Sequence, residues 1–221
     1  MLNLELKHTY NRETGKEDRK IMSTQNSQIQ IIKRDGKKEP LDLEKMHKVV
    51  FYACRDLKNV SASQVEINSH LSFYNNIKSD EIQETLINSS ANLISEEAPN
   101  YQYVGGRLIN YHLRKMVYGQ FEPWHILDLI KKNVQEEYYD TELLKTYTEQ
   151  EWDTINGFIK HSRDENLTYA AMEQFRGKYL VQNRVTGELK ETPQMCYMLI
   201  AATLFAEYPT NTRLRWVKEY Y

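Results

Sequence analysis

IQIIKRDGKKEPLDL, residues 29–43, is the stretch that decides how this 221-residue chain folds. Apolar and polar residues alternate on both sides of Asp35-Gly36, and Asp-Gly between two alternating runs is the strongest short-range signal for a β-hairpin. Four basic side chains surround the turn: Lys33, Arg34, Lys37 and Lys38. Cations beside backbone N–H groups suit an anion, a phosphate in particular. The alternative is a solvated hairpin tip, where basic residues are common.

Four helices are expected after the hairpin. Asp42 caps the first helix, over 43–57, and Ser61 with Gln64 forms a capping box for the second. Ser79 starts the third helix, and the fourth runs over 100–118, behind Pro99 as its first helical residue and before Gly119. Residues 29–119 are therefore predicted to form a small sheet covering a four-helix bundle.

The interior of the fourth helix contains Gly105-Gly106. Each glycine costs about 1 kcal/mol against alanine in a helix. The pair marks either a close approach to another element or a weak point, and close packing is the favoured interpretation.

Residues 120–221 are predicted to form a mostly helical domain with one β-hairpin, so the fold class is mainly α. Helices are expected over 124–135, 141–146, 148–159, 172–176, 193–205 and from Thr210 or Asn211 to the end. The hairpin occupies 178–190 and turns near Thr186-Gly187. The last helix carries Trp216, Val217 and Tyr220, which are expected to be unshielded and to pack against a further segment.

Composition excludes several classes of protein. A net charge of −2 argues against a general nucleic-acid binder, and no apolar run approaches the roughly 20 residues that cross a bilayer. Residues 1–28 are polar and are predicted to form a flexible arm, and Met22 is an alternative start to Met1. Cys54 and Cys196 lie on apolar helical positions, so buried inert thiols and a reducing cytoplasmic setting are expected.

The fourth helix has a basic C-terminal half, which places Lys115 near the hairpin if the helix packs under the sheet. Three convergent cations, Lys33, Arg34 and Lys115, match the charge of a triphosphate. No Walker A sequence is present, so this is not a P-loop site. The alternative is that these cations simply complement the helix dipole.

Other polar residues offer weaker signals. Glu39 and Asp42 have the oxygens for a magnesium ion or a ribose hydroxyl, and equally serve as a surface acid and a helix cap. His47 and His112 are candidate neighbours of a nucleotide. Tyr101 and Tyr103 are suited to stacking on a base or to core packing.

Three long runs resemble a known family. IIKRDGKKEPLDLEKMHKVV, NVSASQVEINSHLSFYNNIKSDEIQETLINSSANLIS and PNYQYVGGRLINYHLRKMVYGQFEP look like an ATP cone. More narrowly, they resemble the N-terminus of the large (alpha) subunit of class Ia ribonucleotide reductase, of the enterobacterial and T-even-phage type. YTEQEWDTINGFIKHSRDENLTYAA, GKYLVQNRVTGEL and YPTNTRLRWVKEYY resemble the helical region before the catalytic barrel of that family.

The resemblance implies an overall-activity site for ATP or dATP as effector, with Mg²⁺. The matching positions are Lys33, Glu39, Pro40, Leu41, Asp42, Leu43, Glu44, Lys45, Ser79 and Lys115, with Arg34, His47, Gln83 and His112 as neighbours. Ser79 replaces the usual threonine and keeps its hydroxyl. Gln83 stands where a histidine is usual, which bears on discrimination between dATP and ATP. Gly105-Gly106 replaces an alanine pair.

The resemblance also defines what the chain lacks. The catalytic cysteines of the family belong to a later barrel, and neither Cys54 nor Cys196 matches one. This chain alone is therefore expected to be enzymatically inactive, with no redox cofactor. The implied partners are the catalytic-barrel portion, the small radical-generating (beta) subunit and further copies in a homo-oligomer, in a bacterial or phage-infected cytoplasm.

Two other interpretations stay open. One is a stand-alone nucleotide-binding regulator, although such proteins usually carry a zinc ribbon and no suitable set of cysteines is present. The other is a degenerate cone that acts only as an interaction or structural module, for which Gln83 and Gly105-Gly106 are the best support.

Overall fold

The first strand of the hairpin organises a three-stranded sheet in the computed structural model, which describes residues 29–221. β1 (Gln30–Ile32) pairs antiparallel with β2 (Lys38–Pro40) and parallel with β3 (Ile77–Lys78), in the order β2-β1-β3. Gly36 adopts a φ of 80° at the turn, a conformation that glycine reaches without steric cost. The hairpin is thus confirmed, whereas β3 was not expected. The arm predicted over 1–28 lies outside the described residues.

Four helices follow as expected, and their bounds are α1 (Leu43–Cys54), α2 (Ala62–His70), α3 (Ser79–Ala91) and α4 (Tyr101–Tyr118). The Asp42 carboxylate accepts a hydrogen bond from the Lys45 N–H at 2.9 Å, which caps α1. α1 ends earlier than predicted because Arg55 is extended and Asp56 takes a φ of 61°. Gly119, with a φ of 71°, ends α4. Pro99 precedes the cap of α4 and is not its first helical residue.

The capping box expected at Ser61 is only half formed. The Ser61 hydroxyl accepts from the Gln64 N–H at 3.4 Å, but the Gln64 side chain does not return to Ser61. Instead the Tyr101 hydroxyl donates to Gln64 Oε1 at 2.6 Å and accepts from the Ser61 N–H at 2.9 Å. Tyr101 is buried, so it packs in the core and does not stack on a ligand.

The second half is helical, with bounds α5 (Ile126–Gln135), α6 (Glu142–Thr146), α7 (Glu149–Phe158), the 3₁₀ helix η1 (His161–Asn166), α8 (Tyr169–Gln174), the π-helix η2 (Phe175–Tyr179), α9 (Pro193–Leu204) and α10 (Thr210–Tyr220). The capping box of α7 is complete, because Thr148 and Glu151 each bond the backbone N–H of the other. The mainly α fold class is confirmed.

The hairpin predicted over 178–190 forms, and it is short. An antiparallel bridge joins Gln182 and Leu189, and on either side of it the Asn183 N–H donates to the Glu188 carbonyl and the Lys190 N–H to the Val181 carbonyl, both at 2.8 Å. The Asn183 side chain accepts from the N–H groups of Val185 and Thr186, at 2.9 and 3.1 Å. These local bonds hold the tip of the hairpin as an Asx-type turn.

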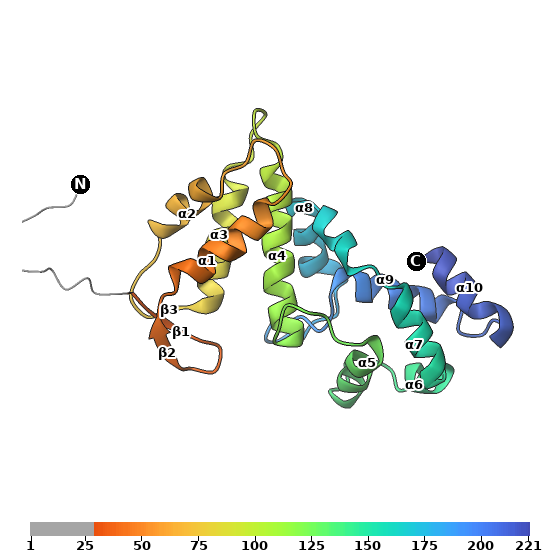
Figure 1. The fold of residues 1–221 in the computed structure, drawn as a ribbon. Helices are drawn as coiled ribbons and strands as arrows, with labels where there is room; N and C mark the ends of the chain where they lie inside the picture. Colours follow the sequence, from red (N-terminus) through yellow and green to blue (C-terminus); the bar gives the residue numbers. More distant parts are fainter. Residues whose placement is uncertain (1–28) are drawn as a thin grey trace, which may run out of the picture.

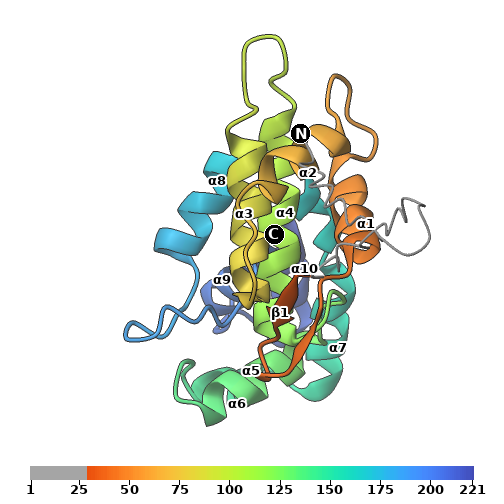
Figure 2. The ribbon, with the colours of Figure 1, turned by 90° about the vertical axis from the view of Figure 1, so that its left-hand side faces the viewer.

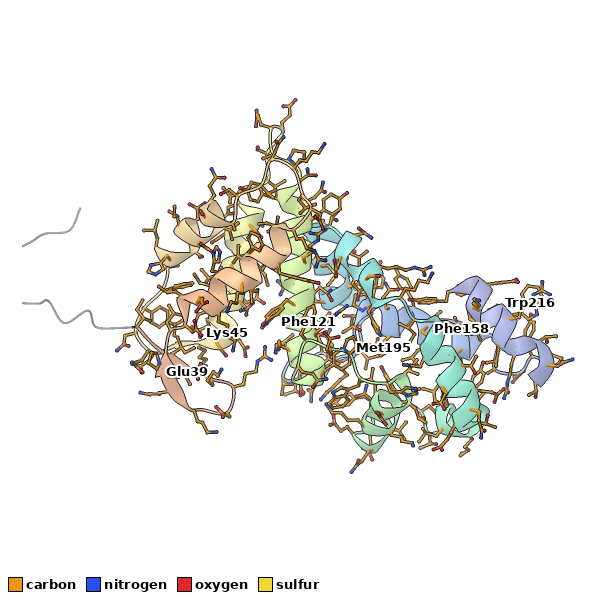
Figure 3. The ribbon with its side chains drawn as sticks, viewed as in Figure 1. Glu39, Lys45, Phe121, Phe158, Met195 and Trp216 are labelled. Atoms are coloured by element: carbon orange, nitrogen blue, oxygen red, sulfur yellow. The ribbon has the colours of Figure 1, made fainter. Side chains whose placement is uncertain are left out.

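The prediction for α10 is partly wrong. Neither Thr210 nor Asn211 caps it, since the Pro209 carbonyl accepts from Thr212 and Arg213 and Thr210 is the first helical residue. Val217 is fully buried, whereas Trp216 and Tyr220 remain exposed, as expected. α10 lies at the end of the molecule opposite the sheet (Figure 1), and Figure 3 shows Trp216 there.

α4 is the central element of the fold. It packs against α1 and α3 on one side and against α8 and η1 on the other, and Figure 1 shows it between the two ends of the molecule. A Cβ atom built on Gly106 would lie 2.0 Å from the carbonyl oxygen of Leu167. The glycine pair therefore does mark close packing, although its partner is the backbone before α8. The boundary at 119/120 remains a prediction.

Gly106→Ala is expected to lower the free energy of unfolding by about 1–3 kcal/mol, because the backbone at Leu167 must move to admit the methyl group. Gly157→Ala in α7 is the control. Nothing lies within 4 Å of the added Cβ there, so that variant should gain about 0.5–1 kcal/mol. Urea unfolding measures both. Equal stability of the two variants would contradict the close contact.

Candidate functional site

A cavity of about 350 Å³ opens between the sheet and the helices α1, α3 and α4. The view from the sheet side shows β1 in front of α3 and α4 (Figure 2). This volume lies within the range of roughly 300–1,000 Å³ that is typical of small-molecule sites. The cavity has a charged side and an apolar side.

The unexpected strand β3 explains how the cavity forms. β1 and β3 run parallel with Ile32 opposite Lys78, so the chain leaves both strands at the same edge, at Lys33 and Ser79. Ser79 is the first residue of α3, whose N-terminus has no side-chain cap. α1 begins at the other edge, because β2 runs antiparallel to β1 and ends at Pro40, opposite Gln30. The uncapped N-terminus of α3 therefore lies at this edge, and its free N–H groups favour an anion.

The cations of the cavity come from three elements. Lys33 pairs with Glu39 at 3.1 Å and Arg34 with Asp80 at 2.6 Å. Within residues 29–221, no ion pair engages Lys45 of α1 or Lys115 of α4. Figure 3 shows Glu39 and Lys45 on the neighbouring elements β2 and α1.

The electrostatics of Lys115 favour an anionic ligand. Burial lowers the pKa of Lys115, and the positive charges of Lys45, Arg34 and Lys33 lower it further. Positive charges that lower one another's pKa repel each other, so holding them close together costs free energy. A bound polyphosphate would remove that cost, because it places negative charge among them.

The other side of the cavity is apolar and consists of Ile31, Leu41, Met46, Val49 and Ile82, with the ring of Tyr111 beside them. The Lys115 ammonium lies 5.8 Å from the centre of the Tyr111 ring. A ligand with a flat apolar part and a polyanionic part would match the two sides of the cavity.

Most of the residues expected at the site do line the cavity: Lys33, Arg34, Glu39, Leu41, Asp42, Lys45, Ser79, Gln83 and Lys115. Pro40, Leu43 and Glu44 belong to the same stretch but are not among the lining residues. His47 is separate from the cavity, because its imidazole bonds the Glu66 carboxylate at 2.7 Å and stacks on Phe51. Gln83 Oε1 is buried without a hydrogen-bond partner in the described part of the chain.

His112 lies behind the cavity wall. It is buried, and its Nδ1 atom is 3.4 Å from Nη2 of Arg34. Burial lowers its pKa, as does the charge of Arg34, while Glu84 and Asp80 act in the opposite direction.

Asp80 and Tyr111 are among the lining residues that the sequence did not assign to the site. Tyr111 precedes Lys115 by one helical turn, so the two share a face of α4, and this spacing was available as a signal. Asp80 offered none, because its contact with Arg34 depends on the pairing of β1 with β3.

The cysteines and the metal-binding side chains give no second site. Burial raises the pKa of Cys54 to about 11 and that of Cys196 to about 12, as expected for inert thiols. Across residues 29–221, no three His, Cys, Asp or Glu side chains are grouped so as to hold a metal ion. In that same range no helix is long and apolar enough to cross a membrane.

Comparison with known proteins gives two family matches. Residues 29–116 match the ATP cone domain, and residues 165–221 match the all-alpha domain of ribonucleotide reductase. The ribonucleoside-diphosphate reductase alpha subunits of Haemophilus influenzae and Escherichia coli (reductase 1) are each 50% identical over 196 residues, which is 89% of this chain and 26% of theirs. The alpha subunit of Enterobacteria phage T4 is 37% identical over 195 residues, or 87% of this chain and 25% of its own. The chain thus spans about a quarter of the length of these relatives.

Proposed function

This chain belongs to the ribonucleotide reductase large (alpha) subunits, as an ATP cone followed by the all-alpha domain, and we propose that its cavity binds ATP or dATP as an allosteric effector. The proposal concerns which nucleotide binds and which residues hold it. It rests above all on Lys45 and Lys115, two cations without ion-pair partners in the described chain, which face the same cavity as Lys33.

The two sides of the cavity suit the two parts of a nucleotide. Lys33, Lys45 and Lys115 would bind the triphosphate, with the uncapped N-terminus of α3 at Ser79 as a further donor. The apolar side, with Tyr111, would receive the base. Glu39 and Asp42 would bind the ribose, because carboxylates accept hydrogen bonds from hydroxyl groups.

Magnesium would enter with the nucleotide. Mg²⁺ usually keeps several waters and binds through substrate phosphates with one or two carboxylates. The cavity offers Glu39, which pairs with Lys33, and Asp42, which also caps α1. These residues fit an ion carried by the phosphates.

The relatives support a proposal for the wider role. We propose that the chain is the overall-activity region of a ribonucleoside-diphosphate reductase, which supports deoxyribonucleotide synthesis once assembled with a catalytic barrel and a beta subunit in a homo-oligomer, in the cytoplasm. The exposed rings of Trp216 and Tyr220 on α10 are the surface proposed to face the barrel. The chain alone is proposed to lack reductase activity.

Calorimetric titration of ATP and dATP with Mg²⁺ into the purified chain tests the proposal. Binding with a micromolar dissociation constant, about −8 kcal/mol, is expected for either or both nucleotides. Titration without Mg²⁺ is expected to give weaker binding, since the ion would bridge the phosphates to the carboxylates of Glu39 and Asp42. If neither nucleotide gives heat or raises the melting temperature, the regulatory proposal is wrong. The chain would then be a degenerate cone that serves for interaction only.

A further inference from the structure

A line of polar contacts leads from the nucleotide cavity into the second half of the chain. Arg34, in the cavity wall, lies 3.4 Å from Nδ1 of His112. Nε2 of His112 lies 3.5 Å from the Glu84 carboxylate. Glu84 in turn binds Arg176 of the π-helix η2 through two hydrogen bonds of 2.7 and 3.2 Å.

The hydrogen-bond donors and acceptors along this line match one another. A guanidinium can only donate, so Nδ1 of His112 must accept from Arg34 and Nε2 must carry the proton that faces Glu84. Burial lowers the pKa of His112, which favours this neutral form. The imidazole therefore has one fixed tautomer as long as Arg34 stays in place.

The Arg34 guanidinium contacts two side chains. Its Nε donates to Asp80 at 2.6 Å, within the cavity wall, while Nη2 contacts His112. A triphosphate in the cavity would compete for the same guanidinium, because phosphate oxygens are strong acceptors for arginine. Any movement of Arg34 toward a phosphate weakens its contact with His112.

The far end of the line is a local irregularity in the fold. Arg176 bonds both Glu84 of α3 and Glu173 of α8, and so joins the two halves of the chain. It lies in η2, a five-residue π-helix. Single π-turns of this kind often occur at functional sites.

We propose that Arg34, His112, Glu84 and Arg176 couple nucleotide occupancy of the cavity to the packing of η2 against α3. This inference rests on the proposed function and specifies how the effector site acts on the all-alpha domain. Because coupling is reciprocal, a change at Arg176 must also alter nucleotide affinity, although Arg176 does not line the cavity.

Two variants have opposite expected effects. Arg176→Met leaves Glu84 without its main cation, so the Glu84 carboxylate attracts His112 and Arg34 more strongly. The dissociation constant for ATP should therefore rise about fivefold. Glu84→Gln removes that attraction, so ATP should bind more tightly than it does to the unmodified chain. A role in folding alone would not give effects of opposite sign.

Hydrogen–deuterium exchange supplies the second measurement. ATP should change the exchange rates of backbone amides over 169–179 in the unmodified chain, and this response should be absent in Glu84→Gln. Arg213→Met is the control, since it breaks a more deeply buried pair with Glu151, and neither residue lines the cavity. It should lower the melting temperature without changing the dissociation constant.

The outcomes separate the two proposals. An unmodified chain that binds no nucleotide overturns the effector site and the coupling together. A chain that binds ATP, but whose affinity and exchange response are unchanged in Arg176→Met and Glu84→Gln, overturns the coupling and leaves the effector site intact. If Arg176→Met fails to fold, Glu84→Gln decides through its exchange response.

Discussion

Lys115→Ala is expected to weaken ATP binding about tenfold to a hundredfold. Lys115 is the cation that α4 brings to the cavity, and no ion pair engages it among residues 29–221. Its positive charge would lie against the triphosphate, and a hydrogen bond to a charged group is worth about 1.5–3 kcal/mol. That free energy corresponds to the stated range of dissociation constants. Calorimetric titration with Mg·ATP measures the change.

Lys48→Ala is the matched control for this prediction. Lys48 also lies on a helix of the cone, but it is exposed and pairs with Glu44, away from the cavity. Its removal should change the dissociation constant less than twofold, since surface pairs contribute about 0–1 kcal/mol. Equal binding by the Lys115→Ala variant and the unmodified chain would mean that the triphosphate lies elsewhere. A loss of the same size in both variants would indicate nonspecific attraction to positive charge.

Glu151→Ala is expected to lower the free energy of unfolding by about 3–5 kcal/mol, the usual effect of breaking a buried ion pair from one side. Glu151 receives two hydrogen bonds from Arg213 of α10 and also completes the capping box of α7 through Thr148. Both charged side chains are about nine-tenths buried, at 10% and 11% exposure. The variant would leave the Arg213 guanidinium buried without its anion. Urea unfolding measures the loss.

The same carboxylate gives a pH dependence of known sign. Bonds from Arg213 hold the pKa of Glu151 below its ordinary value of 4.5. A carboxylate with a lowered folded-state pKa stabilises the protein above its unfolded-state pKa, and this stability is lost as the pH falls through the folded-state value. Glu151→Gln should therefore be less stable at pH 7, and the difference from the unmodified chain should shrink below about pH 4.5.

Glu142→Ala is the control for Glu151. Glu142 is exposed and pairs with Lys145 one turn away on α6. Its loss should change stability by at most about 0.5 kcal/mol, as is usual for surface positions. A Glu151→Ala variant as stable as Glu142→Ala would show that α10 does not depend on the Arg213–Glu151 pair.

Sequence alone located the features whose bonds are local. The hairpin turn at Asp35-Gly36, the cap at Asp42 and the capping box of α7 all join residues within four positions of one another, so their signals lie within a short window. The close packing at Gly105-Gly106 was also inferred correctly, because glycine in a helix interior needs a reason. The partner of that packing, Leu167, was not visible in the sequence.

Local signals failed where a distant residue competed for the same group. The Ser61 N–H was expected to donate to the Gln64 side chain. It donates instead to the hydroxyl of Tyr101, which is 40 positions away in the sequence. Val217 looked exposed on α10 because the helices that bury it, α7 and α9, are separate in the chain.

The sequence by itself determined the hairpin, the helices, their principal caps and the family, because short-range hydrogen bonds and long motif runs require no knowledge of the packing. Only the tertiary structure decided that β3 pairs with β1 and so brings Ser79 and Asp80 to the cavity. It alone placed α4 against both halves of the chain and joined Arg34 to Arg176 through His112 and Glu84. The physical reason is that these contacts depend on which surfaces are buried together when the helices pack. This holds for a strand of two residues, and for the bond between Glu84 and Arg176, which are 92 positions apart.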